Sequence, residues 1–172
     1  MKHFLATFIL AASMLALTNN ADANAIQLSL VPGVQLVDKE KDVDFLRLAI
    51  VGQNNNVTGI DLGIGGLVDG NFKGVGLDLI HNVKGDMQGL QWSAWNYAGG
   101  EAAGLQLGYI NGAKSLSGVQ VGLINYTEDN GVLQIGGINV GNCSKGWQIG
   151  FINVNTNPDA TLPFMVFVNG SF

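Results

Sequence analysis

The stretch GLQLGYIN, at Gly104–Asn111, decides the fold because close copies of it recur along the chain. Two of these copies are GVQVGLINY at Gly118–Tyr126 and WQIGFINVN at Trp147–Asn155. When seven units are aligned on their third residue, that residue recurs at spacings of 15, 15, 15, 14, 14 and 14. Self-similarity at a fixed period is typical of an array in which each structural unit stacks on the next.

Three polar or small columns run through the alignment. The third residue defines a Gln column: Asp61, Gly76, Gln91, Gln106, Gln120, Gln134 and Gln148. Two positions later lies a small column: Gly63, Asp78, Ser93, Gly108, Gly122, Gly136 and Gly150. Five positions later lies an Asn column: Gly66, His81, Asn96, Asn111, Asn125, Asn139 and Asn153. Apolar residues alternate with these columns, and a period of two predicts strands rather than helices.

Two all-β architectures are compatible with the repeat. In a β-solenoid the 14–15-residue units stack in parallel, about 4.8 Å apart, and equivalent Asn and Gln amides bond along the stack. In an antiparallel meander or a small outer-membrane β-barrel each unit is one strand, and its apolar face contacts lipid. The constant polarity of the motif favours the solenoid. The links add apolar residues in register that would close a second wall: Phe72, Met87, Ala102 and Leu116.

The N-terminus has the pattern of a secretory signal peptide. Lys2 precedes an apolar run at Phe4–Leu17, and Ala21-Asp22-Ala23 and Ala23-Asn24-Ala25 both fit a small-x-small cleavage site. The predicted organisation is a signal peptide over 1–25, a β lead-in or cap over 26–58, the repeat array over 59–160, and a terminal strand or cap over 161–172.

Charge and composition exclude some functions. The net charge is −5 with 12% charged residues, so the chain lacks the basic surface that nucleic-acid binding needs. After removal of the signal peptide, His81 is the single histidine. We therefore predict that the protein is not an enzyme, and we assign no catalytic, cofactor-binding or metal-binding residue.

The repeats resemble a family of bacterial exported surface-repeat proteins with GLQxGxxN units, which occur in spirochaetes and other Gram-negative bacteria. The lead-in AIQLSLVPGVQL (Ala25–Leu36) and the ending LPFMVFVNGSF (Leu162–Phe172) are similar to that family as well. The resemblance implies export, but it implies no activity, because the family is largely uncharacterised. The first two units depart from the pattern and are expected to cap the array, since terminal repeats are commonly atypical.

The departures from the repeat are the candidate ligand or interface residues. Asp61 and Asp78 are expected to face solvent on the capping coils, and His81 is expected to act as a hydrogen-bonding member of the Asn column. Trp92, Trp95 and Tyr97 cluster in one unit. Aromatic residues of this kind fill a core, form a subunit contact or stack on a sugar.

These features together predict a non-catalytic, exported structural or interaction protein of the bacterial cell envelope. A rigid array would present a flat Gln/Gly face to a partner, a role that suits repeat proteins. The alternative is a small outer-membrane β-barrel that acts as a pore or scaffold. The expected location is the periplasm, the outer membrane or the cell surface of a Gram-negative bacterium. The partner is unknown, and self-association, envelope components and outer-membrane association all stay open.

Overall fold

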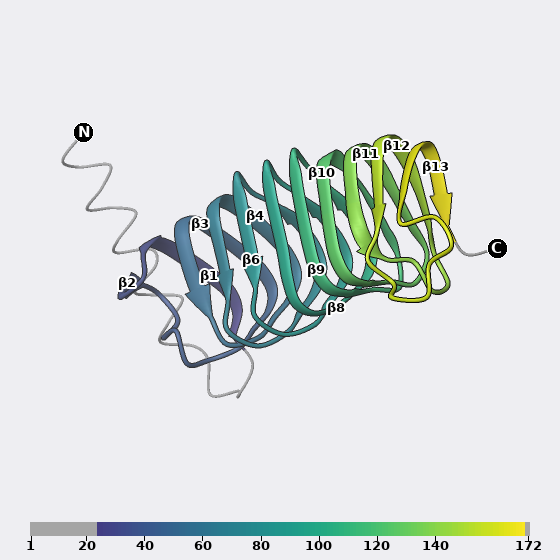
Figure 1. Ribbon diagram of the computed structural model, residues 1–172. Helices are drawn as coiled ribbons and strands as arrows, with labels where there is room; N and C mark the ends of the chain where they lie inside the picture. Colours follow the sequence, from purple (N-terminus) through teal and green to yellow (C-terminus); the bar gives the residue numbers. More distant parts are fainter. Residues whose placement is uncertain (1–23, 171–172) are drawn as a thin grey trace.

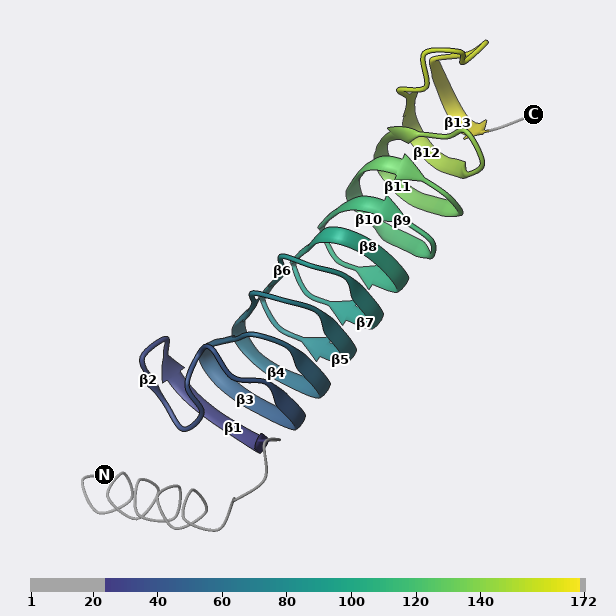
Figure 2. The same cartoon turned by 90° about the horizontal axis from the view of Figure 1, so that it is seen from below.

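The computed structural model describes residues 24–170, which form a β-solenoid of about eight turns (Figure 1). Figure 2 shows the coils following one another along a rod, with β1 and β13 at opposite ends. The strands are β1 (Asn24–Val31), β2 (Val34–Gln35), β3 (Val43–Asn54), β4 (Val57–Val68), β5 (Phe72–Leu77), β6 (Ile80–Val83), β7 (Met87–Trp92), β8 (Trp95–Leu107), β9 (Ile110–Leu116), β10 (Val119–Asn130), β11 (Leu133–Asn142), β12 (Trp147–Asn155) and β13 (Phe164–Gly170).

Successive coils pair in parallel and in the register of the repeat. Gln120 of β10 pairs with Gln106 of β8 on one side and with Gln134 of β11 on the other. Asn125 pairs in the same way with Asn111 and Asn139. The predicted solenoid is confirmed, and the antiparallel alternatives are wrong for the stacked coils. Parallel stacking wins because it aligns identical amides along the whole array.

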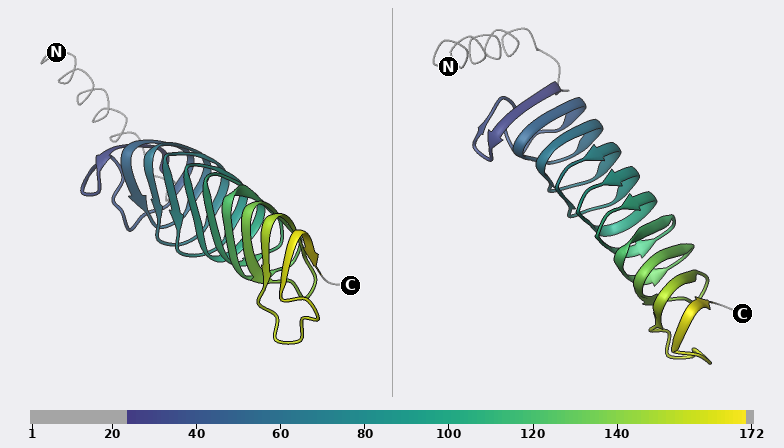
Figure 3. Two further views of the ribbon diagram at one scale, coloured as in Figure 1. Left: turned by 45° about the horizontal axis from the view of Figure 1, so that its top comes forward. Right: turned by 90° about the horizontal axis from the view of Figure 1, so that it is seen from above.

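Antiparallel strands occur at the two ends of the rod. β2 folds back on β1, and β13 pairs antiparallel with β12, from Trp147 opposite Gly170 to Val154 opposite Phe164 (Figure 3). β13 thus covers the backbone edge of the last coil, which would otherwise be free to pair with another chain. No helix within residues 24–170 is long and apolar enough to cross a membrane. Residues 1–23 of the predicted signal peptide lie outside the part of the chain that the structure describes.

The Gln column lies inside the coil as a hydrogen-bonded ladder. Each amide donates from Nε2 to the Oε1 of the preceding coil: Gln106 to Gln91 at 2.7 Å, Gln120 to Gln106 at 2.7 Å, Gln134 to Gln120 at 2.8 Å and Gln148 to Gln134 at 2.9 Å. The glutamines from Gln91 to Gln148 are at most 1% exposed. A buried amide is stable only when it is hydrogen-bonded, and the ladder meets that requirement coil by coil.

The Asn column forms a second ladder on the facing wall of the coil. Here Nδ2 donates to the Oδ1 of the following coil, at 2.8 Å for each pair from Asn96 to Asn153. Asn111 also donates to the carbonyl of Val121 at 2.9 Å. The two ladders donate in opposite directions, so their amide dipoles partly cancel. The predicted stacking of both columns is confirmed.

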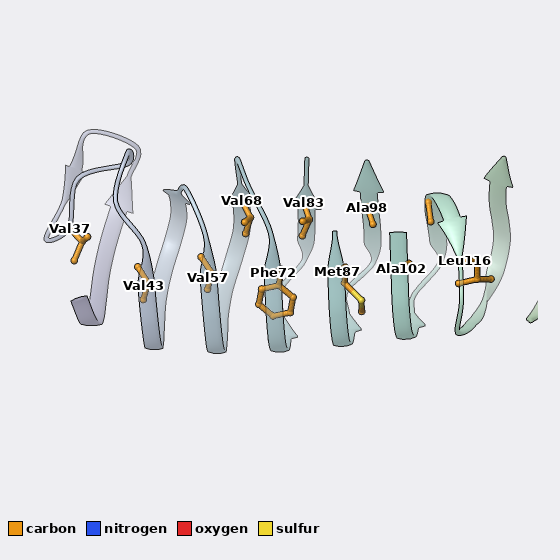
Figure 4. Packing of buried hydrophobic residues seen from close by; sticks show 11 residues of the cluster. Val37, Val43, Val57, Val68, Phe72, Val83, Met87, Ala98, Ala102 and Leu116 are labelled. Carbon is orange, nitrogen blue, oxygen red and sulfur yellow. The ribbon is translucent and has the colours of Figure 1, made fainter. Parts of the chain in front are cut away.

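The other half of the interior is apolar from Val43 to Leu116 and carries buried polar residues at both ends, at Asn54, Thr127 and Asn130. One row combines Val43, Val57, Phe72, Met87, Ala102 and Leu116, and a facing row combines Val68, Val83, Ala98 and Ala113 (Figure 4). The residues of these rows are at most 1% exposed. The predicted second wall of Phe72, Met87, Ala102 and Leu116 is thus confirmed.

A column of glycines permits the close stacking of the coils at one position. Gly59, Gly74, Gly89 and Gly104 all have positive φ angles, 125° in the case of Gly89. A Cβ atom on Gly89 would lie 2.1 Å from the carbonyl oxygen of Gly74. Only glycine avoids both the backbone strain and this overlap. Glycine is therefore a structural requirement at these four positions, whereas Val132 occupies the equivalent position of a later unit.

The outer surface carries the large apolar side chains. Because the Gln-column residue of each unit points inward, the apolar residues directly before and after it point outward. The Gln/Gly face that the sequence predicts as a binding surface is therefore wrong for the glutamines, which are internal. The side chains that a partner would meet are instead apolar.

Candidate functional site

The residues that depart from the repeat pattern lie close together inside the rod. Asp61 of β4 occupies the Gln column, and His81 of β6 occupies the Asn column on the facing wall. Asp78 lies at the corner between β5 and β6, where each coil turns from one wall to the other. The ligand-type atoms of these three residues all lie within 4.8 Å of one another. We name Arg47, Asp61, Asp78 and His81 the buried charge cluster.

Arg47 of β3 provides the positive charge of the cluster. It stands in the Gln column directly before Asp61, and both side chains are 0% exposed. Its Nε donates to Asp61 Oδ1 at 2.7 Å, its Nη2 donates to Asp61 Oδ2, and its Nη1 donates to the Leu67 carbonyl at 2.8 Å. The bidentate guanidinium–carboxylate pair replaces the amide ladder at this point of the core.

His81 lies between the two carboxylates. Its Nε2 is 3.4 Å from Asp61 Oδ2, and its Nδ1 is 3.7 Å from Asp78 Oδ2. The ring meets Phe72 edge-on, with 4.6 Å between ring centroids. Neither ring nitrogen has a hydrogen-bond partner among residues 24–170. Burial lowers the pKa of His81 to about 4, which Asp61 opposes and Arg47 reinforces.

Asp78 is the second carboxyl group of the cluster. Its side chain is 1% exposed, and neither oxygen has a hydrogen-bond partner in the described part of the chain. Burial and, to a smaller extent, the Asp61 charge raise the pKa of Asp78 to about 8 against the opposing effect of Arg47. A buried carboxyl group without hydrogen-bond partners carries a free-energy cost.

Missing side chains make room for the cluster. A Cβ atom on Gly76 would lie 2.2 Å from Cε1 of His81, and one on Gly66 would lie 2.7 Å from Oδ2 of Asp61. The glycines at these positions replace a Gln and an Asn of the repeat. The absent Gln side chain at Gly76 is thus compensated by the imidazole that reaches across from His81.

The aromatic cluster predicted from the sequence lies outside the coil. Trp92, Trp95 and Tyr97 are 61%, 51% and 40% exposed, so they do not fill the core. Asp78 of the buried charge cluster and Trp92 of this surface both line one pocket of about 360 Å³. Its lining consists of Asp78, Trp92, Ser93, Ala94, Gly108 and Tyr109.

Three expectations for the site residues are wrong. Asp61 and Asp78 do not face solvent, because their columns point into the coil. His81 does not continue the Asn ladder, because its ring nitrogens are directed at carboxylates instead of at Asn96. The atypical units do not cap the array, since β3 and β1 stack before them in parallel.

Sequence reasoning missed Arg47, which lies in the segment predicted as the lead-in. A usable signal was present, because Arg47 precedes Asp61 by 14 residues, the spacing of the later repeats. The alternation around it, FLRLAI at 45–50, also matches the repeat. Chemically, the cluster offers two carboxylates and an imidazole to a cation or a proton, with a guanidinium that holds one carboxylate in place.

Comparison of the chain with protein-family models, with curated proteins and with solved structures gives no match.

Proposed function

We propose that the protein is a non-catalytic, exported scaffold of the bacterial cell envelope that attaches to a lipid surface through its apolar outer face. The observation that carries this proposal is a set of outward apolar side chains that extends along the rod and contains no charged residue. Export is supported by the signal-peptide pattern of the first 25 residues, and the resemblance to exported surface-repeat proteins supports the envelope location.

The outward apolar residues form a ridge centred on the corner of each coil. Its crest includes Ile64, Leu79, Tyr109, Leu123 and Phe151, which are 54–74% exposed. Columns on both sides continue the ridge: Ile60, Val75, Leu90, Leu105, Val119, Leu133 and Trp147 lie along one wall, and Ile80, Trp95, Ile110, Ile124, Ile138 and Ile152 lie along the other. We name this surface the apolar ridge. Monomeric soluble proteins rarely expose so extended an apolar surface.

Charge is segregated from the apolar ridge. The crest and both flanking columns contain no charged residue between positions 60 and 152. Charged side chains gather at the opposite edge, in the links that carry Asp69, Lys84, Asp86, Lys114 and Glu128. This segregation makes the rod amphipathic across its width, as interfacial membrane elements are.

The convex shape of the ridge favours lipid over a second copy. A second rigid copy can cover one of the two walls that meet at the crest, and it leaves the other in water. Fluid acyl chains adapt to both walls at once. All three tryptophans and all three tyrosines of the chain are also at least 40% exposed on this rod. These residue types are enriched where membrane meets water.

Vesicle co-sedimentation of the mature protein tests this proposal. We expect binding to neutral phosphatidylcholine vesicles that is nearly independent of salt, because the contact is apolar. Leu123→Glu should weaken binding by roughly tenfold or more, since it removes about 1.5–3 kcal/mol of apolar burial and adds a charge.

Gln88→Glu is the matched control, because it adds the same charge at an exposed position off the ridge. It should bind vesicles like the parent. A parent protein that forms a stable dimer and leaves vesicles unbound would identify a second copy as the occupant and contradict the lipid proposal. Equal binding by Leu123→Glu and the parent would also contradict it.

A further inference from the structure

We propose that Asp61, Asp78 and His81 bind one divalent transition-metal ion of the Zn²⁺ class inside the rod, with Arg47 holding Asp61 in place. This site is independent of the apolar ridge and of attachment to lipid. The observation that leads to it is a concentration of unsatisfied buried atoms. Seven of the nine buried side-chain nitrogen and oxygen atoms that lack a hydrogen-bond partner within residues 24–170 belong to residues 78–96.

The unsatisfied atoms surround one point of the ladder system. They include both oxygens of Asp78 and both ring nitrogens of His81. The two amide ladders also end here, so that Gln91 Nε2 and Asn96 Oδ1 have no partner in the described chain. In the rest of the described chain only Asn130 Oδ1 and Gln148 Oε1 are buried side-chain atoms without a partner, so the unsatisfied atoms concentrate at this interruption. The interruption costs free energy unless a bound group offsets it. A cation that accepts lone pairs from Asp78 and His81 removes the largest part of that cost.

The geometry fits a small cation. Ligands about 2.0–2.1 Å from a tetrahedral ion lie about 3.3–3.4 Å from one another. The distance from Asp61 Oδ2 to His81 Nε2 is 3.4 Å, and the three potential ligand atoms lie within 4.8 Å of one another. His81 gives this ion only Nε2, while Asp78 Oδ2 lies 3.7 Å from the other ring nitrogen. The Asp78 side chain must therefore rotate toward the ion to complete a three-residue site with one position left for water.

The surrounding charges also fit. Arg47 offsets one of the two carboxylates, so the ionised cluster keeps one excess negative charge in a water-poor interior. A divalent cation offsets that charge. The bidentate contact of Arg47 with Asp61 is a typical outer partner of a metal ligand, because it fixes the orientation of the carboxylate.

The donor set indicates the class of ion. One imidazole and two carboxylates suit Zn²⁺ and related transition metals, whereas Ca²⁺ takes six to eight oxygen ligands. Thiolate-preferring ions are disfavoured, since Cys143, the single cysteine, lies between five and six repeat units away from Asp61, toward the C-terminal end of the array. Asp78 also lines the surface pocket, which marks the side of the cluster from which an ion would enter.

Calorimetric titration of metal-stripped mature protein with Zn²⁺ tests the site. The parent should bind one ion per chain. Asp78→Ser should weaken binding by about 100-fold or more, since loss of an outer partner alone costs about 10–100-fold. Serine is the residue that the next unit carries in the same column, at Ser93. This variant is therefore expected to fold, which circular dichroism can verify.

A second variant and a control separate loss of ligands from loss of fold. His81→Asn combined with Gly76→Gln restores the repeat's own residues in both columns, and it should fold well and lose Zn²⁺ binding. Glu128→Gln, at an exposed carboxyl group, should bind like the parent. The site does not exist if the parent binds no stoichiometric metal, in which case a proton occupies the cluster. Equal binding by Asp78→Ser and Glu128→Gln would overturn it as well.

Discussion

Replacement of Gln120 by leucine should destabilise the rod by roughly 2–6 kcal/mol, although it puts an apolar residue of similar size into a buried position. Gln120 donates to Gln106 Oε1 at 2.7 Å and accepts from Gln134 Nε2 at 2.8 Å. Leucine leaves both partners buried without that bond, and each such loss costs about 1–3 kcal/mol. Urea denaturation followed by circular dichroism measures the change in the free energy of unfolding.

The matched control makes the opposite change, from leucine to glutamine, at a position on the outer surface. Leu123 of the same strand is 62% exposed, so Leu123→Gln should change the free energy of unfolding by less than about 0.5 kcal/mol. In most proteins a buried glutamine-to-leucine change would destabilise the fold less than Gln120→Leu is expected to. A Gln120→Leu variant as stable as the parent would mean that the ladder contributes nothing to stability.

The second large effect is expected at the buried ion pair. Arg47→Gln alone and Asp61→Gln alone should each destabilise the rod by about 3–5 kcal/mol, because each leaves the other charge buried without its partner. Both residues stand in the Gln column, and Gln27 of β1 stands next to Arg47 in the same register. The double variant therefore extends the amide ladder through β1, β3 and β4.

We expect the double variant to recover most of the loss, to within about 1 kcal/mol of the parent, because replacing both partners of a buried pair is often neutral. Urea midpoints of the parent, the two single variants and the double variant form a complete double-mutant cycle. If the double variant were as unstable as the sum of the single ones, the core would require the charge pair itself. The ladder would then not be the general solution for that column.

The repeat was enough to predict the strands, their parallel stacking and the two amide ladders. Gln106, Gln120 and Asn111 recur in register, and only parallel coils align them. The sequence could not settle which side of each strand faces inward. Alternation defines two faces, and the usual rule would place Leu105 and Leu107 inside and Gln106 outside. The ladder overrides that rule, because stacked amides satisfy one another in every coil.

The site was predictable only as a set of unusual residues. The alignment identifies Asp61, Asp78 and His81 as departures, but they stand in three different columns. Their convergence depends on the turn between Leu77 and Ile80, which brings the Gln and Asn columns to facing walls. That corner lacks the glycine, proline or asparagine pairs that mark turns in a sequence. For the same reason, the sequence did not predict that the His81 imidazole fills the space left by the missing side chain at Gly76.

In this fold the Gln and Asn columns lie inside the rod, and the apolar residues that alternate with them lie outside. Hydrogen exchange of the side-chain amides, measured by NMR, tests this arrangement most directly. The Nε2 hydrogens of Gln106, Gln120 and Gln134 are buried and bonded, so they should exchange with solvent orders of magnitude more slowly than the exposed side-chain amide of Gln88. Exchange of the ladder amides at the rate of Gln88 would contradict the account.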